Sequence, residues 1–377
     1  MREGSDQSNN AGSIDLNKEN GSRLDSPQSS SIIEQLERKG SLSKAEYIQL
    51  LQDDSASTAE LIFEKARRIR NQHYSNHIYV RGLIETTNYC QNDCFYCGIR
   101  RSNRQVVRYR LSGEEILGCC HRGYEMGFRT FVLQGGEDPA WTDEKVAKLV
   151  AAIKHRYPDC AVTLSLGERK KESYQLYYEA GADRYLLRHE TANDSHYRML
   201  HPPELSLEHR RQCLWNLKEI GFQIGTGMMV GSPGQTLECL ADDFMFIQEL
   251  QPHMVGIGPF ISHKDTPFHD ALNGTLMQTL RILGILRIML PKALLPATTA
   301  LATIDPIGRE KGILAGANVI MPNLTPQEAR KNYMLYDNKK STGLENAEGL
   351  IELKKSMREM GYEIVVSRGD YAGFCVN

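Results

Sequence analysis

Cysteines and long apolar runs are scarce in this sequence of 377 residues, and each shortage excludes a class of protein. Nine cysteines are too few for a disulfide scaffold in a chain of this length. No apolar run approaches the roughly 18 residues of a membrane span, and no hydrophobic segment of the secretory type stands at the N-terminus. The formal net charge of −2 argues neither for nor against an electrostatically bound nucleic acid. We expect a cytoplasmic enzyme, with neither nucleic acid nor a membrane among its partners.

What the sequence does have is a tight group of three cysteines, Cys90, Cys94 and Cys97, with Tyr96 directly before the last. A short loop with this spacing can wrap three sulfurs around one inorganic centre. A structural zinc site is closed by four protein ligands, and the other six cysteines form no second group at ligand spacing. Iron–sulfur clusters are held by thiolates, and a cubane held by only three leaves one iron open. Zinc and a structural disulfide are the alternatives.

The N-terminal region divides into a polar tail and a helical segment. Residues 1–31 have hardly any apolar side chains and are predicted to be disordered. Residues 32–76 are predicted to form helices that close the bottom of the following domain. Two sequences of the capping-box form, Ser43–Glu46 and Ser57–Glu60, predict helix starts.

Eight short apolar or β-branched runs alternate with helical stretches between residues 77 and 336. This alternation indicates parallel strands joined by right-handed crossovers, and eight such units over about 250 residues are typical of an α/β protein of the TIM-type (β/α)8 barrel. A doubly wound sheet is the alternative, but no Gly-x-Gly-x-x-Gly follows the first strand. Residues 337–377 are predicted to be a C-terminal helical extension. The predicted strands are Ile78–Glu85, Thr130–Leu133, Ala161–Leu166, Arg184–Arg188, Gln223–Val230, Met254–Gly258, Leu294–Thr298 and Ala317–Met321.

Polar and glycine residues gather where these strands end. The cysteine loop follows the first strand, Gly135–Glu137 follows the second, Arg188–Thr191 ends the fourth and Thr298–Thr299 ends the seventh. A single glycine at a strand end is ordinary turn punctuation. The set as a whole predicts a site at the C-terminal ends of the strands, where TIM barrels place their chemistry.

Several stretches resemble the HydE family of radical S-adenosylmethionine (SAM) enzymes, the maturases of FeFe-hydrogenase. The cysteine motif alone is typical of the whole radical SAM superfamily, whereas Arg188–Asn193 and Pro296–Thr299 are far more discriminating. Methylornithine synthase and biotin synthase are similar to a lesser degree. The matching stretches are Cys90–Cys97, Val132–Asp138, Thr163–Glu168, Tyr185–Asn193, Met254–Phe260, Pro296–Thr299 and Ala317–Asn323.

The resemblance implies a role for each matching residue. Cys90, Cys94 and Cys97 would hold a 4Fe-4S cluster whose fourth iron binds SAM, and no catalytic residue is implied beyond the cluster and SAM. The residues implied in SAM binding are Gly135, Gly136, Glu137, Glu190, Arg210 and Met254, with Met254 beside the sulfonium. The residues implied to line the substrate chamber are Ser165, Arg188, Thr298, Thr299, Met321, Tyr333 and Tyr336. An arginine fork suits a carboxylate, and a glutamate suits sugar hydroxyls.

The resemblance also implies a reaction and its partners. In that family SAM is cleaved reductively to methionine and a 5′-deoxyadenosyl radical, which acts on a cysteine-bound iron carbonyl–cyanide precursor during assembly of the hydrogenase H-cluster. The implied partners are this substrate with its amino-acid carboxylate, an electron donor such as ferredoxin or flavodoxin, and other hydrogenase maturases. One alternative is a mutase of the methylornithine synthase type that acts on an amino acid. The other is a non-catalytic iron–sulfur or zinc scaffold.

Ordinary structural roles are the alternative for several of these residues. Glu190 and Arg210 could form surface ion pairs, Arg188 could pair with Glu190 or Asp183, and Met321 and the two tyrosines could belong to the core. Many family members also have three cysteines near the C-terminus for an accessory cluster. This sequence has only Cys375 there, so we expect no second cluster. The cysteines expected to be small buried hydrophobes are Cys119, Cys120, Cys160, Cys213 and Cys239.

Overall fold

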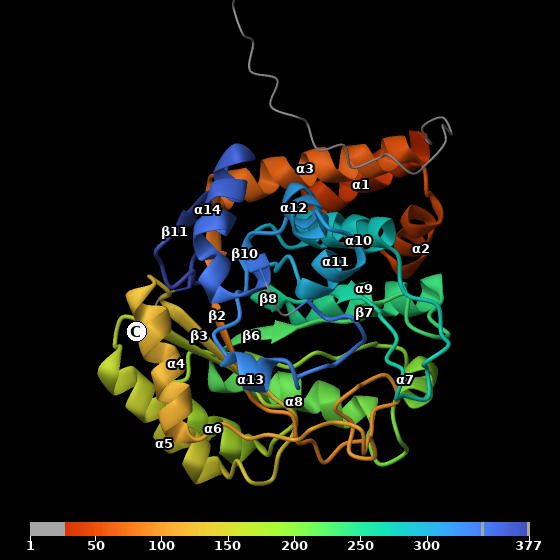
Figure 1. Ribbon diagram of the computed structural model, residues 1–377. Helices are drawn as coiled ribbons and strands as arrows, with labels where there is room; N and C mark the ends of the chain where they lie inside the picture. Colours follow the sequence, from red (N-terminus) through yellow and green to blue (C-terminus); the bar gives the residue numbers. More distant parts are fainter. Residues whose placement is uncertain (1–26, 341–342, 375–377) are drawn as a thin grey trace, which may run out of the picture.

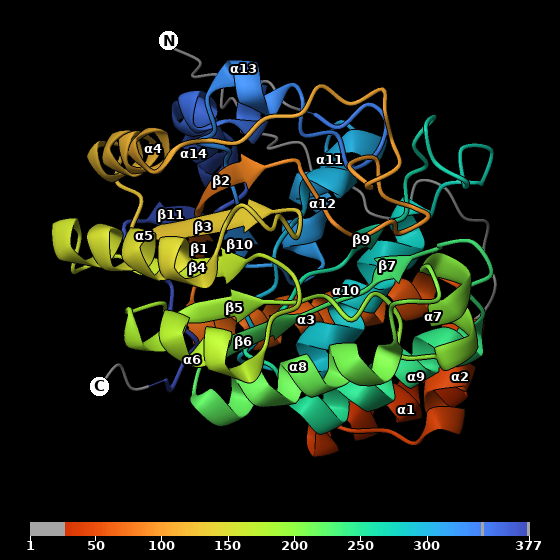
Figure 2. The same ribbon diagram turned by 90° about the horizontal axis from the view of Figure 1, so that it is seen from below.

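Parallel strands surrounded by helices form a barrel in the computed structural model, which describes residues 27–340 and 343–374 (Figures 1 and 2). The predicted disorder of residues 1–26 and the position of Cys375 lie outside the described residues. None of the described helices has both the length and the apolar character needed to cross a membrane.

The barrel strands follow one another in sequence order. Six of them pair in the order β2-β3-β4-β5-β6-β8. Single bridges at Leu294 and Pro296 join the seventh predicted segment to β8 and β10, and Leu83 of β2 pairs with Asn323 just after β10. These bridges complete the circle, so the predicted TIM-type barrel is confirmed. The strands are β1 (His77–Val80), β2 (Gly82–Thr87), β3 (Thr130–Gly135), β4 (Ala161–Ser165), β5 (Arg184–Leu186), β6 (Gln223–Thr226), β7 (Met229–Val230), β8 (Met254–Val255), β9 (Gly258–Pro259), β10 (Val319–Ile320) and β11 (Glu363–Val365).

Three predicted strands are each split in two. The segment 78–85 changes partners at Arg81, because β1 pairs with β10 and β11 whereas β2 begins the six-stranded sheet. The segments 223–230 and 254–258 also divide, and their second halves, β7 and β9, pair with each other. The predicted strand 294–298 makes only single bridges, since Pro296 has no N–H to donate to a ladder.

Helices cover the outside of the barrel, and their starts test the predicted caps. Ser43 caps α2 and Ser112 caps α4, each in a complete capping box. The predicted cap at Ser57 is wrong, because α3 begins at Ala56 with Ser55 as its cap. The helices are α1 (Pro27–Lys39), α2 (Lys44–Gln52), α3 (Ala56–Tyr74), α4 (Gly113–Glu125), α5 (Asp143–Arg156), α6 (Lys171–Glu179), α7 (Asp194–Leu200), α8 (Leu207–Ile220), α9 (Leu237–Leu250), α10 (Leu276–Met289), α11 (Thr299–Ile304), α12 (Gly308–Leu314), α13 (Gln327–Arg330) and α14 (Leu350–Glu359), with short 3-10 turns at Gly343–Glu345 and Ala347–Gly349.

The two ends of the chain differ from the sequence prediction. Residues 27–31 are helical, because α1 starts at Pro27 and the buried Ile33 and Leu36 fix it to the core. The N-terminal helices do not close the bottom of the barrel, since α3 packs along α10 (Figure 1). The C-terminal extension is not only helical, because β11 pairs with β1.

Residues that follow β11 cover the N-terminal ends of the strands. Arg184, the first residue of β5, donates to Asp370 at 2.5 Å and to the carbonyl of Arg368 at 2.9 Å. The side chain of Gln223, the first residue of β6, donates to Asp370 at 2.8 Å. The C-terminal segment therefore closes the end of the barrel opposite the predicted site.

Side chains of alternate strand residues fill the barrel interior in layers. Gln134 is paired with Glu85 on one side and with Ser165 on the other, so these three side chains share a level and a face near the C-terminal mouth. The layer below surrounds a cavity of about 20 Å³. The cavity is lined by Arg81, Val132, Thr163, Leu186, Met254, Gly256, Leu294, Pro296 and Met321.

Candidate radical SAM site at the barrel mouth

Arginine side chains hold the three-cysteine loop in shape. Both carboxylate oxygens of Asp93 accept from Arg100, each at 2.8 Å, and this pairing holds the pKa of Asp93 well below its usual range. The guanidinium of Arg108 donates to backbone carbonyls along the loop. Its acceptors are Asn88, Ile99 at 2.8 Å, Arg100 at 2.6 Å and Asn103 at 3.1 Å. Charge-assisted hydrogen bonds of this kind fix the loop before any ligand binds.

The glycine bend after β3 lies directly against this loop. A Cβ on Gly136 would lie 2.2 Å from the carbonyl oxygen of Tyr89 and 2.8 Å from the Cβ of Cys90, so only glycine permits the approach. The backbone N–H of Gln91 donates to the carbonyl of Glu137 at 2.8 Å. The structure therefore brings the predicted bend, Gly135–Glu137, and the predicted cysteines into one place.

The three thiols are partly buried and mutually repulsive as thiolates. Burial raises the pKa of the Cys90 and Cys94 thiols, and it raises the pKa of Cys97 to about 12. Bound cations reverse this balance, because a coordinating thiol is deprotonated outright. Across residues 27–340 and 343–374, no three His, Cys, Asp or Glu side chains converge tightly enough to hold a single metal ion. The three sulfurs lie on a preorganised loop, with Arg108 and Arg210 near enough to favour thiolates. This arrangement fits a cluster of several metal ions, in which the ligands need not converge on one ion.

Arg210 is buried and forms an ion pair with Glu168 through its Nε atom. Its Nη1 atom donates to the carbonyl of Arg188 at 2.9 Å, and the backbone N–H of Glu168 donates to the Glu137 carboxylate at 2.9 Å. Burial opposes the charge of Arg210, but the negative charges of neighbours such as Glu168 outweigh it and raise the pKa of Arg210. Arg210 is thus in an ion pair, but this pair is buried and not at the surface. Through Arg188 on one side and Glu137 on the other, the pair connects the end of β5 to the glycine bend.

Arg188 lies beside Glu190, as the alternative interpretation of Arg188 expected. The Nη2 atom of Arg188 and the Oε2 atom of Glu190 are 3.2 Å apart, but their relative orientation does not allow a hydrogen bond. The Nε and Nη2 atoms of Arg188 and the Oε2 atom of Glu190 are buried without a hydrogen-bond partner. The other candidate partner, Asp183, is occupied by Arg368 at 2.7 Å. Buried polar groups without partners are rare in proteins and indicate places where a ligand can bind.

Glu190 also has an uncommon backbone conformation, with φ at +66°. Its N–H donates to the carbonyl of Gly227 at 3.0 Å, and this bond ties the strained residue to the end of β6. Left-handed φ values in residues other than glycine cost roughly 1–3 kcal/mol and cluster at functional sites. The strain therefore supports the prediction that Glu190 belongs to the site.

Met254 is grouped with Met321 and not with the cysteine loop. Both side chains line the small cavity one layer below the mouth, where Arg81 donates to the Met254 sulfur at 2.9 Å. The predicted place of Met254 beside the SAM sulfonium stays a prediction, since this cavity lies one layer below the glycine bend. Burial lowers the pKa of Arg81 well below its usual value, and two of its nitrogens have no hydrogen-bond partner.

The predicted chamber residues after the seventh and eighth strands occupy the mouth. Thr298 donates to the carbonyl of Ile257 at 3.2 Å, and Thr299 begins α11. Gln134 donates to the hydroxyl of Tyr333 at 3.4 Å, so Tyr333 reaches the layer that holds Glu85 and Ser165. Burial raises the pKa of both Tyr333 and Tyr336, and the charges of Glu85 and Arg188 also act on Tyr336.

Sequence reasoning missed a buried ion pair at the mouth. Lys339 pairs with Glu85, and neither side chain is more than 8% exposed. The ammonium also donates to the carbonyl of Tyr333 at 2.9 Å. Alternation along β2 places Glu85 inward and could have indicated its role, but Lys339 lies beyond the predicted barrel and carries no local signal.

Lys339 belongs to a segment, residues 331–340, that we call the strap. The strap crosses from the cysteine loop to the far side of the mouth. Its carbonyls at Leu335 and Asn332 accept from the Gly98 backbone and the Asn88 side chain, each at 2.8 Å. At its other end, the N–H of Asp337 donates to the carbonyl of Ser262 at 3.0 Å.

A buried histidine positions the aromatic residue of the cysteine motif. His201 donates from Nδ1 to the carbonyl of Tyr197 at 2.9 Å, and burial lowers its pKa to about 3. Its Nε2 atom, 3.2 Å from the hydroxyl of Tyr96, is therefore an acceptor. His201 fixes Tyr96, which directly precedes Cys97, and sequence reasoning gave it no role.

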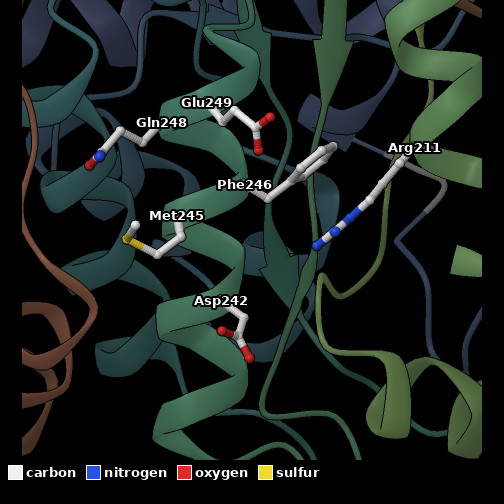
Figure 3. A pocket seen from close by; sticks show the side chains of 6 residues that line it. All are labelled: Arg211, Asp242, Met245, Phe246, Gln248 and Glu249. Carbon is white, nitrogen blue, oxygen red and sulfur yellow. The ribbon is translucent and has the colours of Figure 1, made fainter. Parts of the chain in front are cut away.

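A second hollow, of about 450 Å³, lies away from the mouth on α9. Figure 3 shows Arg211 reaching toward Phe246. Arg211 donates to the carbonyl of Ala192 at 2.8 Å, Asp242 pairs with Lys44 at 2.5 Å, and Gln248 accepts from Tyr47 at 3.0 Å. These polar groups are already used between helices, so we assign this hollow no function. It is lined by Arg211, Asp242, Met245, Phe246, Gln248 and Glu249.

Comparison with known proteins agrees with this geometry. The family model of the Radical SAM superfamily matches residues 84–247. The solved structure of methylornithine synthase (PylB) superposes with a TM-score of 0.75 at 23% identity, covering 89% of this chain and 97% of that one. The maturase HydG of the [FeFe]-hydrogenase gives a TM-score of 0.75 at 20% identity, covering 90% of this chain and 76% of that one. The fold and the site thus define a radical SAM enzyme.

Sequence similarity narrows the assignment further. The chain is 44% identical to the [FeFe] hydrogenase maturase subunit HydE of Thermotoga maritima over 308 residues, which cover 82% of this chain and 87% of that protein. It is 29% identical to 3-methylornithine synthase of Methanosarcina acetivorans, over 75% of this chain and 81% of that protein. The chain belongs to the HydE family of radical SAM hydrogenase maturases, a family that implies a 4Fe-4S cluster and SAM.

Proposed function

We propose that this enzyme cleaves SAM at the barrel mouth and acts on a cysteine-bound iron carbonyl–cyanide complex in H-cluster assembly. The contact between the cysteine loop and the Gly135–Glu137 bend supports this proposal, because the three thiols and the glycine-rich bend lie side by side. Cys90, Cys94 and Cys97 hold the 4Fe-4S cluster, which supplies one electron to SAM when both are bound. The protein itself binds and orients SAM and the substrate, and it excludes water from the site.

The residues around the bend hold SAM. The carbonyls of Gly135 and Gly136 are the natural acceptors for its ammonium, and the Glu137 carboxylate braces the bend through the backbone of Glu168. The Oε2 atom of Glu190 lies 3.2 Å from Arg188 but has no hydrogen-bond partner, so it can accept from the ribose hydroxyls. Because Arg210 is paired with Glu168, we assign it the role of fixing this wall of the site, with its remaining donors available to the SAM carboxylate.

Arg188 is the residue that recognises the substrate carboxylate. Two of its nitrogens are buried without hydrogen-bond partners. Ser165 ends β4, the strand next to β5, and Thr298 follows the seventh predicted strand further round the barrel. A carboxylate can accept from both nitrogens at once, and the loss of one partner of such a pair typically costs ~2–5 kcal/mol. The amino-acid part of a cysteine-bound iron complex supplies this carboxylate.

An Arg188→Leu variant tests the substrate assignment. We expect turnover of the synthetic cysteine–iron complex to fall by about 30-fold or more, consistent with the energy of a carboxylate pair, while SAM cleavage without substrate persists. Arg198→Leu is the matched control, because Arg198 is 76% exposed on α7. Normal substrate turnover by Arg188→Leu would rule out this role, and conversion of lysine by the wild type would favour the mutase alternative.

A Cys90→Ala variant that still assembled the cluster after anaerobic reconstitution would contradict the metal assignment.

A further inference from the structure

One oxygen of the Glu85 carboxylate is not used by the protein. Glu85 is completely buried, and its Oε1 atom pairs with Lys339. Its Oε2 atom has no hydrogen-bond partner among the residues that the structure describes. A carboxylate oxygen that is buried without a donor is costly, and native proteins rarely contain one. This oxygen therefore marks a place where a donor from outside the chain can bind.

Lys339 is held in a position that leaves this oxygen open. Its ammonium donates to the carbonyl of Tyr333 at 2.9 Å and lies 4.8 Å from the centre of the Tyr333 ring. The backbone of Glu85 is fixed as well, because its N–H donates to the hydroxyl of Thr325 at 2.8 Å and its carbonyl accepts from Tyr109 at 2.9 Å. Moving the ammonium to Oε2 would break its contacts with Tyr333.

The side chain of Glu85 lies on the interior face of the barrel. Val132 and Thr163 line the small interior cavity, so Gln134 and Ser165, each two residues further along its strand, face the interior one layer higher. Glu85 pairs with Gln134 across the sheet and therefore shares that face. The open oxygen thus belongs to the layer of Ser165, one of the predicted chamber residues.

An arginine with unused donors faces the interior from another strand. Arg188 is two residues beyond Leu186, which lines the same cavity, and the intervening His189 points outward to α9. Within the described part of the chain, two nitrogens of Arg188 are buried without hydrogen-bond partners. The charges of Glu85 and Arg188 both act on Tyr336 in the strap, so both groups lie near it. The mouth therefore offers one acceptor and one donor pair of opposite charge.

We infer that Glu85 binds the amine of the substrate's amino-acid part while Arg188 binds its carboxylate. The inference rests on the proposed function and adds to it the group that recognises the other end of the amino acid. A charged amine is the donor that a buried carboxylate oxygen binds most strongly, and Glu85 repels a carboxylate that Arg188 attracts. The two residues together fix the direction in which the substrate lies. The site thereby selects amino acids over acids that lack the amine.

The test compares two probes that differ only in the amine, L-cysteine and 3-mercaptopropionate. Each is titrated calorimetrically into full-length enzyme that contains the reconstituted cluster and SAM. We expect the wild type to bind L-cysteine about tenfold or more tightly than 3-mercaptopropionate, as is typical of a hydrogen bond between charged groups. In a Glu85→Gln/Lys339→Met variant this preference should fall to about threefold or less, because the amide offers only a neutral acceptor.

The double variant removes both charges of the pair, so no unpaired charge stays buried in the fold. A purely structural effect would change both affinities alike and leave their ratio intact. An Arg309→Met/Glu345→Gln variant is the matched control, since this pair is similarly buried but lies between α12 and the 3-10 turn Gly343–Glu345. The control should keep the wild-type preference for L-cysteine.

Three results would overturn the inference. These are equal affinity of the wild type for the two probes, an unchanged preference in the Glu85 variant, and an equal loss of preference in the control. Failure of the wild type to bind either probe while it cleaves SAM would overturn it too. Absence of reductive SAM cleavage in the wild type would instead contradict the proposed function.

Discussion

Gly136 is the residue at which the backbone itself forms the site. Its missing side chain lets the bend after β3 approach the carbonyl of Tyr89 and the Cβ of Cys90, and both of these atoms belong to the cysteine loop. We expect Gly136→Ala to displace this loop, because a Cβ at 2.2 Å from a carbonyl oxygen cannot be accommodated without a backbone shift. Iron bound after anaerobic reconstitution should fall several-fold while the far-UV circular dichroism is retained.

Gly113→Ala is the matched control for this substitution. Gly113 is the first residue of α4, and a Cβ built there meets no atom within 4 Å. Alanine in a helix is also favoured over glycine by about 1 kcal/mol. The control should bind iron normally and be slightly more stable. Equal iron content in the Gly136→Ala and Gly113→Ala variants would show that the close approach has no role in holding the cluster.

At the scale of elements, the strap depends on one buried charge pair. Lys339→Met leaves Glu85 without its counter-charge inside the barrel, and breaking a buried pair in this way typically costs ~3–5 kcal/mol. We expect the urea midpoint to fall accordingly, and the amide of Gly98, which donates to Leu335 in the strap, to exchange faster with solvent. Both changes follow from the loss of the pair that holds the strap over the mouth.

A double substitution separates charge from side-chain size. Glu85→Gln combined with Lys339→Met removes both charges and should recover part of the lost stability, since the unpaired buried charge is gone. Lys331→Met, in an exposed pair with Glu328, should change stability by less than ~1 kcal/mol. If the double variant were less stable than Lys339→Met alone, the pair would not be the source of the effect.

The strap also shows where sequence prediction stops. Alternating strands and helices predicted the barrel, and spacing predicted the cysteines, because both signals lie within short stretches of chain. The pairing of Lys339 with Glu85 joins residues 254 positions apart, and β11 joins the sheet through β1 across a similar distance. The break at Arg81 depends on which neighbours β1 and β2 find. These long-range pairings depend on how the barrel closes, which no short stretch of sequence encodes.

For the molecule as a whole, the C-terminal segment closes the barrel bottom, and it packs against a group that can titrate, His253. The Nδ1 atom of His253 accepts from the backbone N–H of Ile224 at 3.1 Å, so this nitrogen must be unprotonated. The ring packs edge-on against Tyr371 and Phe374, at 4.8 Å and 5.6 Å between ring centres. Burial lowers the pKa of His253 to about 4. The neutral imidazole is therefore part of the closed bottom.

The lowered pKa of His253 makes the protein less stable in mild acid. An unfolded histidine has a pKa near 6.5, so below that pH the unfolded chain binds a proton at this residue and the folded chain does not. The free energy of unfolding therefore falls as the pH drops from about 6.5 toward 4. Because a single proton is involved, the slope from His253 cannot exceed ~1.4 kcal/mol per pH unit. We expect the free energy of unfolding to decline between pH 7 and pH 5, measured by urea titration. His253→Asn should flatten part of this decline, because its amide oxygen can accept from Ile224 without titrating. The ion pair of Asp370 with Arg184 does not contribute in this window: burial opposes the charge of Asp370, but Arg184 and Arg368 hold its pKa well below the usual range. Parallel pH profiles for the wild type and His253→Asn would therefore exclude His253 as the group that opens the barrel bottom in mild acid.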